Sequence, residues 1–233
     1  MTDVSSSPRD GATAAERLER VRARMAAACE RAGRSLDAVR PVAVSKTKPA
    51  EAVCELAACG QTLFGENRVQ EAQTKIPRCP PNLEWHLIGH LQTNKAKQAV
   101  RLFRMIHSVD SIKLLETLDR CAATPLPVLL QVNVSGEASK FGMRPEDLET
   151  AIETANTLQK VEVHGLMTIP PFSPDPEKTR KHFAALRELR DRTSAATATP
   201  LPELSMGMSN DFEVAIEEGA TFVRVGTDLF GRR

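Results

Sequence analysis

Short apolar runs alternate with amphipathic segments along most of the chain, and this alternation restricts the possible folds more than any other feature. Start signals such as Ser111 and Pro145 support several of the amphipathic segments as helices. Eight apolar runs are strand candidates: 41–45, 62–65, 83–89, 105–109, 127–134, 161–169, 203–208 and 222–226. Seven segments between them are helix candidates: 49–59, 66–75, 92–103, 111–122, 145–159, 176–194 and 211–218.

Repeated strand-then-helix units require parallel strands joined by right-handed crossovers. Eight such units in 233 residues fit a closed (β/α)8 barrel, a TIM-like α/β fold, better than an open doubly wound sheet. The open sheet is less favoured because no G-x-G-x-x-G follows an early strand. No G-x-x-x-x-G-K-[ST] occurs either, so the best signals for dinucleotides and nucleoside triphosphates are both missing.

An extra helix should precede the barrel and end near Gly33, where glycine favours a helix stop. Residues 1–12 are rich in Ser, Pro and Gly, so we expect a flexible N-terminal segment there. Residues 13–233 then form a single barrel domain. The apolar positions of the extra helix recur at helical spacing: Leu18, Val21, Met25 and Cys29.

Charge and composition point to a small-molecule ligand. The formal net charge is +1, which gives no electrostatic case for nucleic acid or an acidic membrane. With 41% hydrophobic and 26% charged residues the chain reads as globular, and no stretch is long enough to span a membrane. The first residues lack a basic region followed by an apolar one, so we expect the cytoplasm.

The cysteines and histidines give no sign of a metal site. The five cysteines are odd in number and form no C-x-x-C, which argues against both a disulfide framework and a thiolate site. The five histidines lack H-E-x-x-H or another ligand spacing, so we predict no metal.

Lys46 follows the first apolar run, where a charge is unexpected. In an extended segment Val42, Val44 and Lys46 share one face. A lysine in partly apolar surroundings favours the neutral amine, which can attack a carbonyl to form a Schiff base. The simpler alternative is that Lys46 marks the exit of the strand into solvent, and local sequence alone favours it.

The last two strand candidates lead into a possible anion site, since barrels bind phosphate after strands seven and eight. After the seventh, the Ser209 hydroxyl and the first free helix amides face one point. After the eighth, Gly226 permits close backbone approach, Thr227 adds a hydroxyl, and Arg224 shares a face with Gly226. Taken singly, Ser209 could be a simple helix cap, Gly226 a turn and Arg224 a salt-bridge partner. Together with Lys46, these residues instead point to one shared ligand site.

A series of separated motifs resembles the pyridoxal 5′-phosphate homeostasis protein family from about residue 14 onward. The motifs occur in matching order: Val42 to Pro49, Phe64-Gly65-Glu66-Asn67, Trp85 to Gln92, Gly165 to Thr168, Leu204 to Ser209, and Val223 to Gly231.

The resemblance implies a barrel similar to the N-terminal domain of alanine racemase. It implies pyridoxal 5′-phosphate (PLP), a form of vitamin B6, held on Lys46 as an internal aldimine. By the same resemblance Ser209 binds the phosphate with the Gly226 backbone and the Thr227 hydroxyl, and Asn67 lies near the phenolic oxygen of the ring.

The resemblance also places Arg224 opposite the pyridine nitrogen. A guanidinium stays charged, so it keeps that nitrogen unprotonated, and a neutral pyridine is a poor electron sink. Carbanion chemistry of the aminotransferase kind instead uses an acidic partner for the ring.

We therefore expect a non-enzymatic PLP carrier that acts in PLP homeostasis and passes the cofactor to apoenzymes, and no repeat or heptad argues against a monomer. The alternative is a PLP-dependent amino-acid racemase. It is disfavoured because two-base racemisation of the alanine racemase type uses a tyrosine, and this chain has none. The chain also ends at Gly231-Arg232-Arg233, so we expect no further β domain. His86, His90 and His164 are possible but weaker substitutes for the tyrosine.

Five positions depart from the family or stay open. Arg68 stands where a tyrosine is common, and Arg232-Arg233 replace an acidic-aromatic ending. Asp211 places a carboxylate near the expected phosphate, so we expect it to point outward. Lys140, in the loop after the fifth strand, is a candidate for a second, transient aldimine during transfer.

Overall fold

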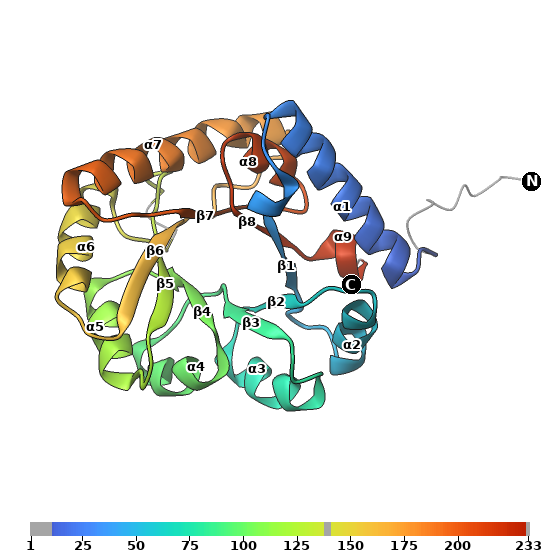
Figure 1. The fold of residues 1–233 in the computed structure, drawn as a ribbon, viewed down its shortest axis with the longest axis horizontal. Coiled ribbons are helices and arrows are strands. Elements are labelled where there is room, and N and C mark those ends of the chain that lie inside the picture. Colours follow the sequence, from blue (N-terminus) through green and yellow to red (C-terminus); the bar gives the residue numbers. More distant parts are fainter. Residues whose placement is uncertain (1–10, 138–140, 232–233) are drawn as a thin grey trace, which may run out of the picture.

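The computed structural model describes residues 11–137 and 141–231, and its strands form the predicted closed barrel in sequence order from β1 to β8 (Figure 1). Each strand pairs in parallel with its neighbours, and β1 closes the ring against β8 with Ala43 opposite Val225. Residues 1–10 of the expected flexible segment lie outside the described residues.

Strand positions agree closely with the apolar runs. The middle strands contain Val, Ile and Leu because they are covered on both faces. Their bounds are β1 Arg40–Val44, β2 Leu63–Glu66, β3 Glu84–Leu87, β4 Met105–Val109, β5 Leu126–Gln131, β6 Val161–Met167, β7 Glu203–Met208 and β8 Phe222–Val225.

Helices surround the barrel, and several begin with a 3-10 turn that the sequence pattern had merged with the helix, as at Pro145–Asp147 and Pro176–Thr179. The short helix α9 was not predicted. The α-helices are α1 Ala14–Arg31, α2 Ala50–Ala58, α3 Val69–Lys75, α4 Ala96–Leu102, α5 Ile112–Cys121, α6 Leu148–Asn156, α7 Arg180–Thr197, α8 Phe212–Glu217 and α9 Thr227–Phe230.

The extra N-terminal helix α1 lies beside α8 and α9 on the outside of the barrel (Figure 1). A capping box starts it: the Thr13 hydroxyl accepts from the Glu16 N–H, and the Glu16 carboxylate accepts from the Thr13 N–H. Arg24 in α1 pairs with Glu213 in α8 and with Asp228 in α9. The α1 helix thus connects to the segments that follow β7 and β8.

The buried side chains form two layers because successive residues of a strand face opposite sides. The larger layer lies between strands and helices and includes Ala43 and Leu130. The smaller one fills the barrel interior: Val42, Leu63, Ile88, Met105, Leu129, Met167 and Phe222, with Val44 and Ile169 partly buried against it. No helix of the described residues is both long and apolar enough to cross a membrane.

Candidate functional site

Lys46 lies two residues beyond β1, at the carboxyl end of the barrel. Val42 and Val44 belong to the interior cluster, as the alternation of the strand predicts. The partly apolar surroundings expected for the lysine amine are not found, because Lys46 is exposed. A turn in which Thr47 has a φ of 62° follows the strand. The turn carries Lys46 out of the barrel interior, so its amine is accessible to a ligand.

A buried ion pair fixes the backbone on both sides of this exposed lysine. Lys75 Nζ lies 2.5 Å from Glu66 Oε1 and donates to the Ser45 carbonyl at 2.7 Å. It also lies 2.8 Å from Glu71 Oε1, which accepts from the Thr47 N–H at 2.6 Å. One lysine therefore holds the residue before the exposed lysine directly and the residue after it through Glu71.

Glu66 carries the buried negative charge of this arrangement. Its Oε1 also accepts from the Ser45 hydroxyl at 2.7 Å, whereas its Oε2 has no partner among the described residues. Burial raises the pKa of Glu66, and the hydrogen bonds from Lys75 and Ser45 oppose that rise. Since a buried carboxylate is costly unless it is paired, the arrangement depends on Lys75.

Ser209 and Gly226 meet where β7 and β8 end. The Gly226 N–H donates to the Ser209 hydroxyl at 3.2 Å. A Cβ added to Gly226 would lie 3.5 Å from the Val44 carbonyl oxygen, so this glycine also lies against the end of β1. Gly226 therefore contacts both the loop after β7 and the strand that leads to Lys46.

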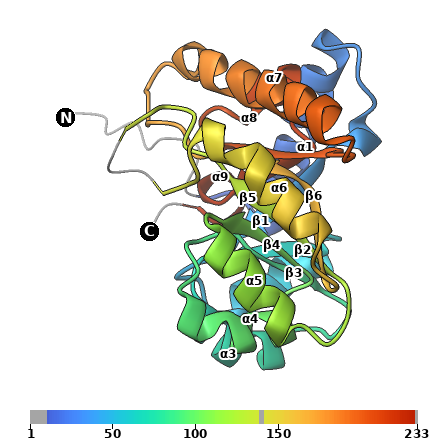
Figure 2. The same ribbon diagram turned by 90° about the vertical axis from the view of Figure 1, so that its left-hand side faces the viewer.

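Asn67 and Thr227 lie at the same end of the barrel. Asn67 is half-buried directly after β2, and Thr227 is the exposed first residue of α9. A Cβ added to Gly89 would lie 2.4 Å from the Asn67 carbonyl oxygen, so the loops after β2 and β3 are in backbone contact. Figure 2 shows the loops after β5 and β6 extending to the left, on the side where α9 lies.

Arg224 lies inside the barrel, two residues before Gly226, and is 3% exposed. Its guanidinium donates to the Ser205 hydroxyl at 2.6 Å and to the Thr168 carbonyl at 2.9 Å. Burial lowers the pKa of Arg224 to about 10, and the Asp211 carboxylate opposes this shift. The side chain is thus cationic at neutral pH, and two of its five N–H donors have these partners.

Asp211 does not face solvent as expected. It is 4% exposed, and its carboxylate accepts from the Met208 N–H at 2.7 Å, within the loop that carries Ser209. Burial raises the pKa of Asp211, while this backbone hydrogen bond and the charge of Arg224 lower it. The carboxylate is therefore used in shaping the loop.

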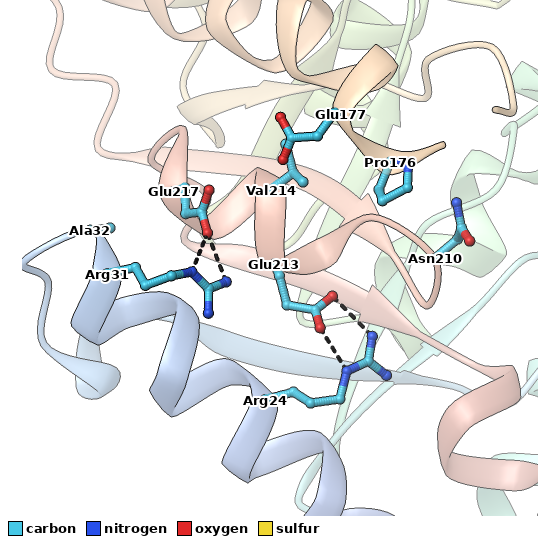
Figure 3. A pocket seen from close by; sticks show the side chains of 9 residues that line it. All are labelled: Arg24, Arg31, Ala32, Pro176, Glu177, Asn210, Glu213, Val214 and Glu217. Carbon is cyan, nitrogen blue, oxygen red and sulfur yellow. Dashed lines mark hydrogen bonds and ion pairs between the residues drawn. The ribbon is translucent and has the colours of Figure 1, made fainter. Parts of the chain in front are cut away.

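A hollow on the outer surface lies between α1, α8 and the residues before α7 (Figure 3). Its two arginines are already paired, Arg24 with Glu213 and Arg31 with Glu217, both at 2.7 Å. Arg24 also donates to the Ser209 carbonyl at 3.4 Å. The arginines of the hollow are therefore neutralised and do not form an anion site. The Arg24 side chain supports the Ser209 loop from outside the barrel.

The remaining sequence candidates contribute less. Arg68 is exposed and directly precedes α3. Lys140 and Arg232-Arg233 lie outside the described residues. Among the described residues, no group of three or more Cys, His, Asp or Glu side chains has a geometry that could hold a metal ion.

Sequence reasoning missed most of the residues that support the site. Lys75 and Glu71 are spaced i, i+4 on α3, which reads as an ordinary helix pair, and only the fold brings Glu66 to them. Ser205 and His107 are polar residues inside apolar strands. The period-two alternation places both on interior faces, and this signal could have identified them.

Comparisons with known proteins match the whole fold. The family model described as "Alanine racemase, N-terminal domain" matches residues 17–233. The pyridoxal phosphate homeostasis protein of Aquifex aeolicus is 48% identical over 94% of this chain and 98% of its own length. The protein of the same name from Pseudomonas aeruginosa is 46% identical over 95% of this chain and 96% of its own length.

A solved structure with bound ligand is also similar. The structure of PipY of Synechococcus elongatus with PLP bound has a TM-score of 0.83 and 41% identity, covering 94% of this chain and 100% of that one. Full-length similarity at this identity covers every strand that contributes to the candidate site.

Proposed function

Because this chain belongs to the family of pyridoxal phosphate homeostasis proteins, we propose that it binds PLP through Lys46 and holds the cofactor as a reversible reserve. The observation that carries the proposal is the position of Gly226. This residue contacts the Ser209 hydroxyl on one side and the end of β1, just before Lys46, on the other.

The donor set fits the chemistry of PLP. The exposed Lys46 amine can condense with an aldehyde and release one water. The Ser209 and Thr227 hydroxyls and the Gly226 backbone suit a phosphate, and a Cβ at Gly226 would have no neighbour closer than 3.5 Å, so backbone there is approachable. Asn67 would approach the phenolic oxygen.

Arg224 favours storage over catalysis. Its cationic guanidinium would donate to the pyridine nitrogen and keep that nitrogen unprotonated. Bound PLP is a poorer electron sink when its ring nitrogen is neutral than when it is cationic. The chain has no tyrosine to act as a second base. Moreover, His86 is enclosed in the barrel, and His164 lies 3.3 Å from Glu162.

The proposal extends to the transfer of PLP, the oligomeric state and the location of the protein. A carrier of this kind would pass PLP to apoenzymes, act as a monomer and work in the cytoplasm. The last point agrees with five cysteines that form no disulfide. Light scattering of the purified protein with and without PLP tests whether it is a monomer. A stable dimer in both states would reject the proposed monomer.

Borohydride reduction and peptide mass mapping test the binding site. After incubation with PLP, the pyridoxyl mass should appear on the peptide containing Lys46. Lys46→Ala should lose the visible absorbance, whereas Lys97→Ala, which removes an exposed lysine from α4, should keep it. Labelling mainly at another lysine would reject the assignment.

Exchange of the α-proton separates a carrier from an enzyme. The loaded protein is incubated with L-alanine in deuterated water, and α-deuterium is followed by NMR. We expect exchange no faster than with free PLP, because the ring nitrogen stays neutral. Rapid, saturable exchange that disappears in Lys46→Ala would show catalysis instead.

A further inference from the structure

A chain of polar side chains crosses the apolar interior of the barrel. The Arg224 guanidinium contacts the Ser205 hydroxyl at 2.6 Å, and that hydroxyl lies 2.8 Å from His107 Nδ1. His107 Nε2 lies 2.9 Å from His86 Nδ1, and His86 Nε2 lies 2.8 Å from Glu84 Oε1. Four contacts thus connect β8, β7, β4 and β3.

These hydrogen-bonded side chains extend from one end of the barrel to the other. Arg224 is near the carboxyl end of β8, and Glu84 is the first residue of β3, at the opposite end. The middle members are fully buried, whereas 41% of the Glu84 side chain is exposed. Glu84 is therefore the member that meets solvent away from the candidate site.

When both histidines are neutral, the Glu84 end sets the direction of the hydrogen bonds. The Glu84 carboxylate can only accept, so His86 carries its proton on Nε2 and accepts at Nδ1 from the Nε2–H of His107. His107 Nδ1 then accepts from the Ser205 hydroxyl. The Ser205 oxygen in turn accepts from Arg224, because a guanidinium can only donate.

The surroundings agree with neutral histidines. Burial lowers the pKa of His86 and holds that of His107 well below its usual value, while the bond to His86 lowers the pKa of Glu84. The Phe222 ring centroid is 5.0 Å from the His107 ring and 5.6 Å from the His86 ring. This apolar packing leaves the two rings little freedom to turn.

We propose that Ser205, His107, His86 and Glu84 form a one-way hydrogen-bond chain that positions the Arg224 guanidinium for the ring of bound PLP. The inference rests on the proposed function, which supplies the ligand. Ser205 fixes one edge of the guanidinium and the Thr168 carbonyl another. The histidines hold the Ser205 hydroxyl with its proton directed at His107 Nδ1, which leaves its oxygen to accept from Arg224.

The tautomers can be measured without any ligand. In protein labelled with ¹⁵N-histidine, two-bond ¹⁵N–¹H correlation spectra distinguish protonated from unprotonated ring nitrogens. We expect both His86 and His107 to be protonated on Nε2 at pH 7, with assignments from His86→Gln and His107→Gln. Protonation of either residue on Nδ1 would overturn the proposed one-way hydrogen-bond chain, whatever the protein binds.

The effect on PLP is tested by breaking the chain and by preserving it. Ser205→Ala removes one of the two acceptors of Arg224 and leaves the Thr168 carbonyl, so PLP should bind about tenfold more weakly. The pH at which the visible band titrates should also move, because the cation at the ring nitrogen is no longer fixed. His107→Leu should act in the same direction. His107→Gln retains both an acceptor and a donor, so it should restore most of the affinity.

Thr193→Ala is the matched control, because Thr193 is a buried hydroxyl residue on α7, outside the barrel. It should leave both PLP affinity and the spectral titration as in the wild type. An unchanged spectrum and affinity in Ser205→Ala, with a folded protein by circular dichroism, would reject the positioning role. Wild-type protein that takes up no PLP would instead reject the proposed function, and the tautomer result would still stand.

Discussion

Lys75 is the residue on which the turn around Lys46 depends most. Its side chain is 6% exposed, and its ammonium bridges the buried Glu66 and the half-buried Glu71. Removing one partner of a buried pair leaves the other charge without compensation, which is more harmful than removing both. The charged side chains of α3 therefore have a structural task that their helix spacing alone does not reveal.

We expect Lys75→Met to lower the free energy of unfolding by about 3 kcal/mol, because Glu66 then stays buried without its cation. Adding Glu66→Gln in the same chain should recover part of that loss. Urea unfolding followed by circular dichroism measures both. Lys97→Met on the exposed face of α4 is the control and should change stability by less than about 0.5 kcal/mol. Equal losses in both lysine variants would contradict the structural role of the pair.

At the scale of elements, the barrel depends on how closely neighbouring strands approach. A Cβ added to Gly165 in β6 would lie 1.9 Å from the Glu203 carbonyl oxygen in β7. At Gly226 the nearest atoms would be 3.5 Å away, an ordinary van der Waals distance. The first glycine is needed for strand pairing, whereas the second is needed only if a ligand approaches its backbone.

We expect Gly165→Ala to destabilise the protein by about 3 kcal/mol or more, since β6 and β7 must separate to admit the methyl group. Gly226→Ala should change stability by less than about 1 kcal/mol but weaken PLP binding, because the methyl group occupies the backbone approach. Thermal unfolding and PLP titration check the two parts. A Gly226→Ala protein with wild-type affinity would show that the phosphate lies elsewhere.

At the scale of the whole molecule, the hydrogen-bond chain from Arg224 to Glu84 crosses an otherwise apolar barrel interior. His86 and His107 are buried, and burial lowers the pKa of each in the folded state. The unfolded chain has histidines with ordinary pKa values near 6.5. Below that pH the unfolded state binds more protons than the folded one, so stability must fall as the pH falls.

We expect the free energy of unfolding to decrease between pH 6.5 and pH 5 by up to about 2 kcal/mol for each of the two histidines. His107→Gln removes one titrating group, so its stability should depend less on pH than that of the wild type. Urea unfolding at pH 7, 6 and 5 measures the slopes. Identical slopes in the two proteins would mean that His107 is not held neutral.

The barrel could be predicted because its signal is local. Each strand candidate is an apolar run, and β4 and β7 were predicted with their observed bounds. The candidate site could be predicted in part, because the carboxyl ends of parallel strands meet at one end of the barrel regardless of how the side chains pack. Helix starts were less certain, since 3-10 turns such as Thr93–Lys95 satisfy the same periodicity as an α-helix.

The sequence by itself determined the parallel barrel, the family and the end of the barrel at which Lys46, Ser209 and Gly226 lie, because these follow from periodicity and motif order. Only the tertiary structure decided that Lys46 is exposed and Asp211 buried. It also decided that His107 meets Ser205, 98 positions further along the chain. Burial and hydrogen bonding at such separations depend on how distant segments pack, and no local pattern of residues encodes them.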